Sequence, residues 1–221
     1  MLSRKKPGFT LAEMLVSVAV IGILAVIMVV NLNSGKRTEQ LSGAARQLAA
    51  DIRGMQSRAL SAGDIKACLN ASADLIVCEN STADCADPAQ CLGMVPDHYG
   101  LMVTTTAAGY SMFVEYSLSG LVNQYMDYPD EQLARKRLLP IGNQDIEISQ
   151  IELWSGTTGW VNPDPTTGSV VFSRQSGQAK IFDAAATGAV MGILKITLRH
   201  KISNETLVIE VNRATGRVSI L

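Results

Sequence analysis

An apolar stretch near the N-terminus most constrains this chain of 221 residues. Residues 9–30 are almost continuously apolar. As an α-helix rising about 1.5 Å per residue, they would be roughly 33 Å long, enough to cross a bilayer core. Arg4, Lys5 and Lys6 precede the stretch, so the positive-inside rule predicts a cytoplasmic N-terminus. We therefore expect one membrane-spanning helix, with the rest of the chain on the far side of the membrane.

Two simpler interpretations of this stretch are a cleaved secretory signal peptide and an ordinary signal anchor. A signal peptide is cut after its apolar core at small residues, but the core here runs into VVNLNSGK without a clear site of that kind. Glu13 argues against both interpretations, because a charged side chain in a membrane helix costs about 2.5 to 3.5 kcal/mol at the bilayer centre. Glu13 lies only about 6 Å into the helix, so its cost is lower but still real.

The run from Gly8 to Glu13, GFTLAE, resembles the processing site of type IV prepilins and pseudopilins. The resemblance implies that prepilin peptidase cuts between Gly8 and Phe9, and that Phe9 becomes the N-methylated terminus. It also implies that Glu13 is the glutamate of filament assembly. The mature chain would then have 221 − 8 = 213 residues.

A buried carboxylate at the depth of Glu13 needs a cation, and the amine that cleavage creates at Phe9 can supply one. In the family this amine belongs to a neighbouring subunit, which sets the axial register of a helical filament. The amine of the same chain is also one helical turn away, so pairing within one chain stays an alternative.

We expect four segments along the chain. Residues 1–8 form a cytoplasmic leader that is cleaved, 9–30 the transmembrane half of a long helix, 31–62 its amphipathic half, and 64–221 a periplasmic β-rich globular domain. The amphipathic half is predicted because apolar residues recur at spacings of three and four, as on one buried helix face. These apolar residues are Leu41, Ala45, Leu48, Ile52, Met55 and Ala59. Gly63 and Asp64 are expected to end the helix.

Beyond residue 64 the apolar pattern alternates with period two, as in strands with one buried face. Strands are expected at 65–69, 74–79, 100–106, 110–117, 146–153, 169–182 (a hairpin), 193–202, 206–213 and 217–221. We expect a short helical piece around 130–137 and a loop from 155 to 168. The predicted fold class is α+β, with the long N-terminal helix packed on an antiparallel β-sheet or sandwich.

Four cysteines fall within one 24-residue window on the expected periplasmic side, namely Cys68, Cys78, Cys85 and Cys91. An even number of cysteines in an oxidising compartment predicts disulfides. Three pairings are possible, and we favour Cys85–Cys91, which closes a short loop, together with Cys68–Cys78. A zinc site is disfavoured, because the sequence has no C-x2-C pair and neither histidine lies at a metal-ligand spacing.

The composition excludes several classes of function. A net charge of −1 and an aromatic content of 5% give no basis for a chain-wide nucleic-acid surface. No P-loop, H-E-x-x-H or G-x-S-x-G motif is present, so we expect neither an enzyme nor a bound cofactor or metal. The segment from Lys195 to Leu221, however, contains five cationic residues and only two glutamates, which gives it a local net charge of +3. DNA binding therefore stays a weaker hypothesis.

The C-terminal third carries a second resemblance. The run VVFSRQSGQAKIF, followed by strands that end in Gly216-Arg217-Val218, is similar to the H-type minor pseudopilins of type II secretion and the related minor pilins, the GspH/FimT group. This resemblance covers about residues 169–221, whereas we match residues 64–145, which contain the cysteines, to no part of the group.

The two resemblances together imply a minor structural subunit of a type II secretion pseudopilus, anchored in the bacterial inner membrane. The alternative is a minor pilin of a type IV or competence pilus, with DNA binding as part of that alternative. The implied partners are other pseudopilins or pilins through the N-terminal helix, prepilin peptidase, an inner-membrane assembly platform and membrane lipid.

Overall fold

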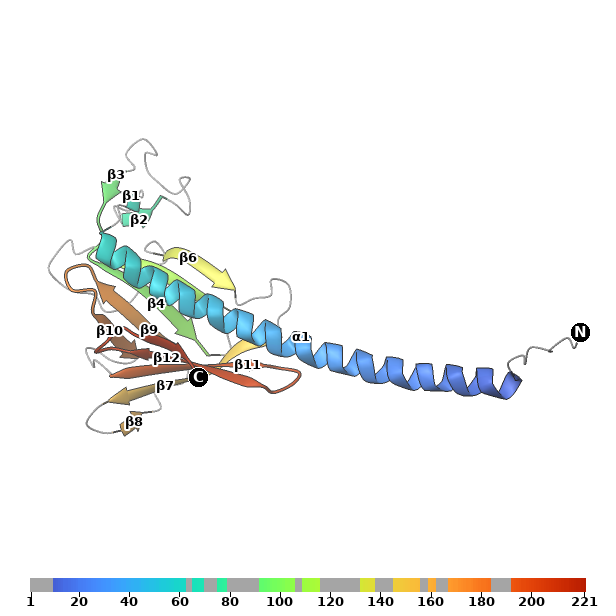
Figure 1. The fold of residues 1–221 in the computed structure, drawn as a ribbon. Coiled ribbons are helices and arrows are strands. Elements are labelled where there is room, and N and C mark those ends of the chain that lie inside the picture. Colours follow the sequence, from blue (N-terminus) through green and yellow to red (C-terminus); the bar gives the residue numbers. More distant parts are fainter. Residues whose placement is uncertain are drawn as a thin grey trace, which may run out of the picture. The chain divides into compact units, whose positions relative to one another are not determined.

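The computed structural model describes residues 10–62, 65–69, 75–78, 92–105, 109–115, 132–137, 145–155, 159–161, 167–183 and 192–221. These residues contain one α-helix and thirteen strands, and every strand pairing among them is antiparallel (Figure 1). The α+β fold class predicted from the sequence is confirmed. The chain divides into two compact units, Met1–Glu39 and Gln40–Leu221.

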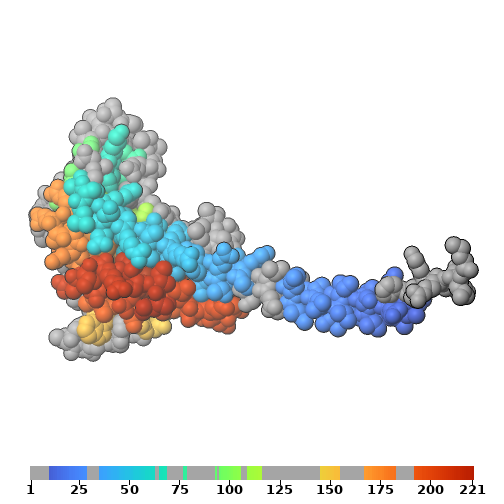
Figure 2. Space-filling view, viewed as in Figure 1, coloured from blue at the N-terminus to red at the C-terminus, as the bar shows by residue number. Residues whose placement is uncertain are grey.

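The helix α1 runs from Leu11 to Ser61, and its first part belongs to the first unit. The segment Leu11–Met28 has a mean hydropathy of 2.6, and none of it is buried. Figure 2 shows this segment in blue, with its apolar side chains at the surface. Within the described residues it is the one helix long and apolar enough to cross a membrane.

The part of α1 in the second unit is buried along one face, as predicted. All six residues of the predicted apolar stripe are at most 2% exposed, and Ala44 and Ala49 extend the stripe. The helix ends after Ser61, and Ala62 follows in the left-handed region at φ 48°. The expected helix end at Gly63 and Asp64 lies outside the described residues.

Beyond the helix, the described residues of the second unit form three sheets. The first five-stranded sheet has the order β10-β9-β4-β5-β6, the second five-stranded sheet β13-β12-β11-β7-β8, and the small sheet β2-β1-β3. Their strands are β1 Ile65–Leu69, β2 Leu75–Val77, β3 Leu92–Met94, β4 His98–Thr104, β5 Gly109–Glu115, β6 Gln132–Arg137, β7 Ile146–Ser155, β8 Gly159–Val161, β9 Thr167–Ser173, β10 Ala179–Asp183, β11 Ile193–His200, β12 Thr206–Asn212 and β13 Val218–Ile220.

One hydrophobic core joins α1 to both five-stranded sheets. Tyr99, Leu101 and Val103 alternate along β4, and all three contribute buried side chains to the same cluster as the α1 stripe. Ile196 and Leu198 of β11 do the same for the second five-stranded sheet. Burial of apolar surface contributes about 25 cal/mol per Å², so this shared core holds the helix and the two sheets together.

The expected short helix around residues 130–137 is wrong. Gln132–Arg137 is strand β6, which pairs with β5 from Gly109↔Arg137 to Phe113↔Gln132. The sequence QLARKR consists of strong helix formers, but an isolated helix of this length is unstable in water. Pairing with β5 instead satisfies the backbone hydrogen-bonding groups along one side of the segment.

A second difference concerns the expected loop from 155 to 168. Gly159–Val161 forms the short strand β8, which pairs with the end of β7. Three residues are too few to give a visible alternation in the sequence. The hairpin of β9 and β10 and that of β11 and β12 are confirmed, and Gly177 in the first of these turns has φ 62°. Only glycine adopts such a conformation without steric cost.

Candidate assembly site at the start of helix α1

The first turn of α1 is closed by reciprocal hydrogen bonds between Thr10 and Glu13. The Thr10 backbone N–H and its hydroxyl both donate to Glu13 Oε2 at 2.9 Å, and the Glu13 backbone N–H donates to Thr10 Oγ1 at 3.3 Å. This arrangement is a capping box, in which two backbone N–H groups of a helix start are satisfied by side chains. It fixes the position and the rotamer of the Glu13 side chain.

The sequence interpretation selected Glu13 but missed Thr10. The spacing T-x-x-E before an apolar run is itself the sign of a capping box, and it could have identified Thr10. The expected cleavage residues Gly8 and Phe9 lie outside the described residues, so cleavage and N-methylation stay predictions.

The capping box uses only one of the two carboxylate oxygens of Glu13 as a hydrogen-bond acceptor. Among the described residues both bonds from Thr10 reach Oε2, whereas Oε1 has no partner. The carboxylate also stands in the first turn of a helix, where the helix dipole favours a negative charge. Around it the helix exposes large apolar side chains such as Leu11, Met14 and Leu15. An additional cation beside Oε1 would therefore stabilise Glu13 in an apolar environment.

In the second unit, two polar links complement the apolar contact between α1 and the sheets. Tyr110 of β5 donates a hydrogen bond to Asp51 Oδ2, and Gln47 Nε2 donates to Tyr110 Oη at 3.1 Å. Burial, followed by the hydrogen bond to Asp51, raises the pKa of Tyr110 above its usual range, so its hydroxyl stays protonated.

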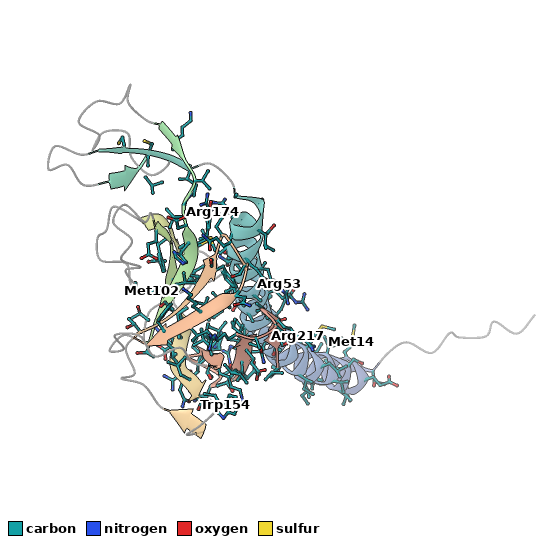
Figure 3. All side chains as sticks on the ribbon, turned by 90° about the vertical axis from the view of Figure 1, so that its left-hand side faces the viewer. Met14, Arg53, Met102, Trp154, Arg174 and Arg217 are labelled. Atoms are coloured by element: carbon teal, nitrogen blue, oxygen red, sulfur yellow. The ribbon has the colours of Figure 1, made fainter. Side chains whose placement is uncertain are left out.

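The second polar link lies on the other side of the helix. Arg53 Nη2 donates to the carbonyl oxygen of Val218 in β13 at 2.7 Å. Because β13 is an edge strand, this carbonyl has no strand neighbour among the described residues. Figure 3 labels Arg53, which belongs to α1, and Arg217, which immediately precedes β13.

Two of the four cysteines are described, and both are disulfide-bonded. Cys68 and Cys78 are 3% and 7% exposed, and Cys68 is in register with Ile76 of the neighbouring strand. Cys85 and Cys91 lie outside the described residues, so the favoured pairing stays a prediction. Within the described part of the chain, no group of three His, Cys, Asp or Glu side chains could hold a metal ion.

The structure also shows that the net positive charge near the C-terminus is smaller than the count along the sequence predicted. Arg199 and Lys201 both form ion pairs with Glu147. Lys195 also pairs with a carboxylate, since its Nζ lies 3.9 Å from Glu210 Oε2. The hydrogen bond from Arg199 holds the pKa of Glu147 below its usual range. Glu147 belongs to β7, far from these cations in sequence, so the count along the C-terminal segment did not include its charge.

Arg213 and Arg217 are the remaining cations of this patch. Neither has an ion-pair partner among the described residues, and both stand in the turn between β12 and β13. Within the described part of the chain, this turn is therefore where the C-terminal segment carries positive charge without an ion-pair partner.

Comparison with known proteins identifies the N-terminal segment. Residues 3–29 match the family model described as the prokaryotic N-terminal methylation motif. This match contains the predicted cleavage residues, the capping box and most of the apolar stretch. Comparisons with curated proteins and with solved structures give no match.

Proposed function

We propose, from the premise that this is a type IV pilin-like protein, that it is a minor pseudopilin of a type II secretion pseudopilus. The prepilin-type motif supports processing by prepilin peptidase and assembly with other pilin-like subunits. The secretion role is supported by the resemblance of residues 169–221 to the GspH/FimT group. The pilin-like family is structural, and we propose no catalytic role.

The observation that carries the proposal is the position of Glu13. It lies five residues after the predicted cleavage point, in the first turn of an exposed apolar helix, with Oε1 without a partner among the described residues. Cleavage after Gly8 would remove three cations and create an ammonium group at Phe9. In our proposal, this ammonium of a neighbouring subunit meets Glu13, and the pair forms away from water, where charge–charge attraction is strong.

The proposed topology follows from the same segment. The N-terminus is cytoplasmic, Leu11–Met28 lies in the inner membrane, and the β-rich unit is periplasmic. The disulfide-bonded state of Cys68 and Cys78 supports an oxidising compartment for the β-rich unit. An assembly platform in the inner membrane would move the helix from lipid into the filament.

A second candidate is a minor pilin of a type IV or competence pilus that binds DNA. The observation that favours it is that Arg213 and Arg217 have no ion-pair partner among the residues that the structure describes. Two arginines are a small patch compared with the phosphate contacts of a typical DNA-binding protein. The secretion role is therefore our first proposal.

Deletion of the gene in its native host separates these candidates. A pseudopilin predicts loss of enzymes from the culture medium and their accumulation in the periplasm, with surface pili unaffected. Loss of surface pili or of DNA uptake, with secretion intact, would contradict the secretion role and support the alternative. A wild-type copy on a plasmid provides the control by restoring the affected process.

A further inference from the structure

Two adjacent cations, Lys36 and Arg37, lie in α1 beyond its apolar segment. They belong to the same compact unit, Met1–Glu39, as the apolar segment Leu11–Met28. The sequence has no other lysine or arginine after Lys6 and before Lys36, so these two are the first side-chain cations beyond the leader. In the proposed topology they stand on the periplasmic side of the membrane.

Neither cation has an ion-pair partner among the described residues. Lys36 is exposed and Arg37 is partly exposed, and no described carboxylate pairs with either of them. Glu39 lies three residues after Lys36, a spacing at which helical side chains can meet. A cation that precedes its carboxylate along a helix is, however, the less favourable order for such a pair. Both positive groups are therefore open to a ligand from outside the chain.

The length of the apolar part of α1 indicates how far these cations lie from lipid. Residues 11–30 make about 30 Å of helix, which equals the thickness of a bilayer hydrocarbon core. Lys36 follows Val30 after about 9 Å of helix, and the headgroup layer on each side is about 5 to 7 Å thick. Because helical side chains tilt toward the N-terminus, those of Lys36 and Arg37 are directed back toward the headgroups. Long cationic side chains near helix ends reach the membrane interface in this way.

We propose that Lys36 and Arg37 bind the phosphate groups of anionic phospholipids at the periplasmic surface of the membrane. A guanidinium group donates two parallel hydrogen bonds to a phosphate, and an ammonium group adds a compact charge. Aromatic side chains cannot anchor this end of the helix, because the first Tyr or Trp of the sequence is Tyr99. The bound headgroups would set the depth of α1 in the bilayer, and movement of the helix into a filament must break these contacts.

A lipid headgroup is favoured over a soluble anion because of its position. The apolar segment holds both cations beside the bilayer, so headgroups are present there at a high effective concentration. A soluble anion would have to pair with exposed charges in water, where an ion pair contributes little. The inference rests on the proposed membrane topology, but it does not depend on the secretion role.

The test uses the ¹⁵N-labelled full chain in phosphatidylcholine bicelles, to which phosphatidylglycerol is added in steps. We expect saturable shifts of the backbone amide signals of residues 35–38, which are separate from the signals of the leader. The double variant Lys36→Gln/Arg37→Gln should weaken this binding at least about tenfold, because each cation near an anionic surface contributes about fivefold. Shifts that the double variant leaves unchanged would overturn the proposal.

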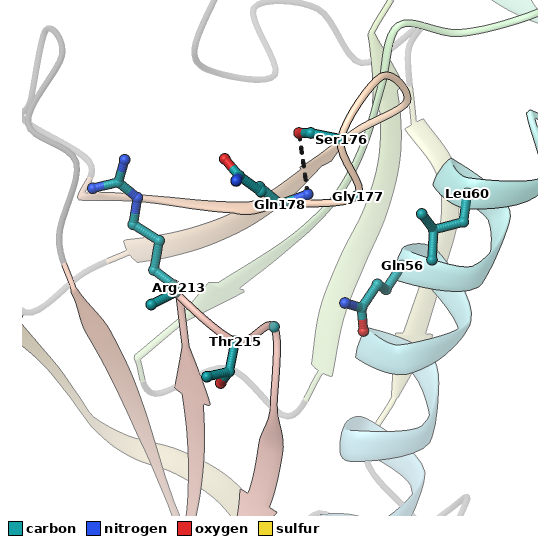
Figure 4. A pocket seen from close by; sticks show the side chains of 9 residues that line it. Gln56, Leu60, Ser176, Gly177, Gln178, Arg213 and Thr215 are labelled. Carbon is teal, nitrogen blue, oxygen red and sulfur yellow. Dashed lines mark hydrogen bonds between the residues drawn. The ribbon is translucent and has the colours of Figure 1, made fainter.

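A second double variant removes the same number of charges elsewhere. Arg46 and Arg213 are exposed cations of the second unit without an ion-pair partner among the described residues. Figure 4 shows that the Arg213 side chain extends away from Gln56 and Leu60, so its replacement should not disturb the helix. Arg46→Gln/Arg213→Gln should change the lipid binding at residues 35–38 less than about twofold. Equal weakening by the two double variants would show a nonspecific effect of charge and overturn the proposal.

Two controls separate the remaining outcomes. Inorganic phosphate added to pure phosphatidylcholine bicelles should leave the amide signals of residues 35–38 in place, and shifts equal to those with phosphatidylglycerol would assign the cations to a soluble anion instead. The amides of residues 11–28 should be shielded from a water-soluble paramagnetic agent. Loss of that shielding would overturn the membrane topology and the inference with it, whereas shielding without lipid-dependent shifts would overturn the inference alone. Thermal unfolding of both double variants checks that the fold is unchanged.

Discussion

Tyr110 of β5 donates its hydroxyl hydrogen to Asp51 of α1 across 59 residues of sequence. This bond lies beside the apolar stripe of the helix and is a polar contact between α1 and the first five-stranded sheet. Because Tyr110 is buried, the hydroxyl has little access to water and depends on these protein partners. Removing this hydrogen bond therefore tests how much it contributes to holding α1 against the sheet.

Replacing Tyr110 by Phe should lower the free energy of unfolding by about 1 to 3 kcal/mol, because the hydroxyl that serves Asp51 and Gln47 is lost. Denaturant unfolding of the full chain in detergent measures this change. A double-mutant cycle with Asp51→Ala, which removes the acceptor, should give a coupling energy of about 0.5 to 3 kcal/mol. A coupling energy near zero would contradict the link.

The core packing of α1 can be tested with two leucines of the same helix. Leu48 is fully buried, so Leu48→Ala should lower the free energy of unfolding by about 2 to 5 kcal/mol through lost apolar contact and the remaining cavity. Leu60 is 63% exposed, so Leu60→Ala should change it by less than about 0.5 kcal/mol. Similar losses in both variants would mean that the stripe does not face the core.

Stability should depend on pH through Glu147. Its pKa is lowered in the folded chain, chiefly by the hydrogen bond from Arg199, so its contribution is present above the ordinary carboxyl pKa of about 4.3. The contribution is lost as the pH falls through the lower pKa of the folded state. The wild-type chain should lose more stability than Glu147→Gln between pH 6 and pH 3, measured by thermal unfolding. Parallel pH profiles would contradict this role.

The predicted disulfides can be mapped directly. Digestion of the non-reduced chain followed by mass spectrometry should give the linked peptides Cys85–Cys91 and Cys68–Cys78. Linkage of Cys68 or Cys78 to either of the other two cysteines would contradict this pairing. Reduction should cost about 2 to 5 kcal/mol of stability in either case, as for native disulfides in small secreted domains.

Much of the fold could be predicted because its signals are local. The apolar length of the N-terminal stretch, the stripe from Leu41 to Ala59 and the alternation in β11 and β12 follow from residues close together in sequence. Strand β6 could not be predicted in the same way, because its helix-forming residues become a strand only through pairing with β5.

The candidate site and the C-terminal charges also divide into features that local sequence predicts and features that depend on the folded sheet. Glu13 is conspicuous in sequence as a carboxylate in an apolar helix, and Thr10 could have been identified from its spacing. The neutralisation of Arg199 and Lys201 by Glu147 could not, because the two strands involved meet only in the folded sheet. Charge counted along one segment therefore overestimated the positive surface.

Loss of the capping box should weaken the association of the chain with neighbouring subunits. Thr10→Val removes the hydroxyl that both donates to Glu13 and accepts from its backbone, and loss of such a cap costs about 0.5 to 2 kcal/mol of helix stability. We expect weaker cross-linking of this variant to neighbouring subunits in native membranes. Thr10→Ser keeps the hydroxyl and should behave as wild type. Equal cross-linking of the two variants would show that the cap has no part in assembly.

The central claim is that cleavage after Gly8 creates the cation that Glu13 needs. The most direct measurement is intact-mass spectrometry of the chain from native membranes and from isolated filaments, for the wild type and Glu13→Val. The account predicts that both chains begin at a methylated Phe9 in membranes, and that only the wild type enters filaments. A chain that retains its first eight residues, or a Glu13→Val chain that enters filaments normally, would contradict it.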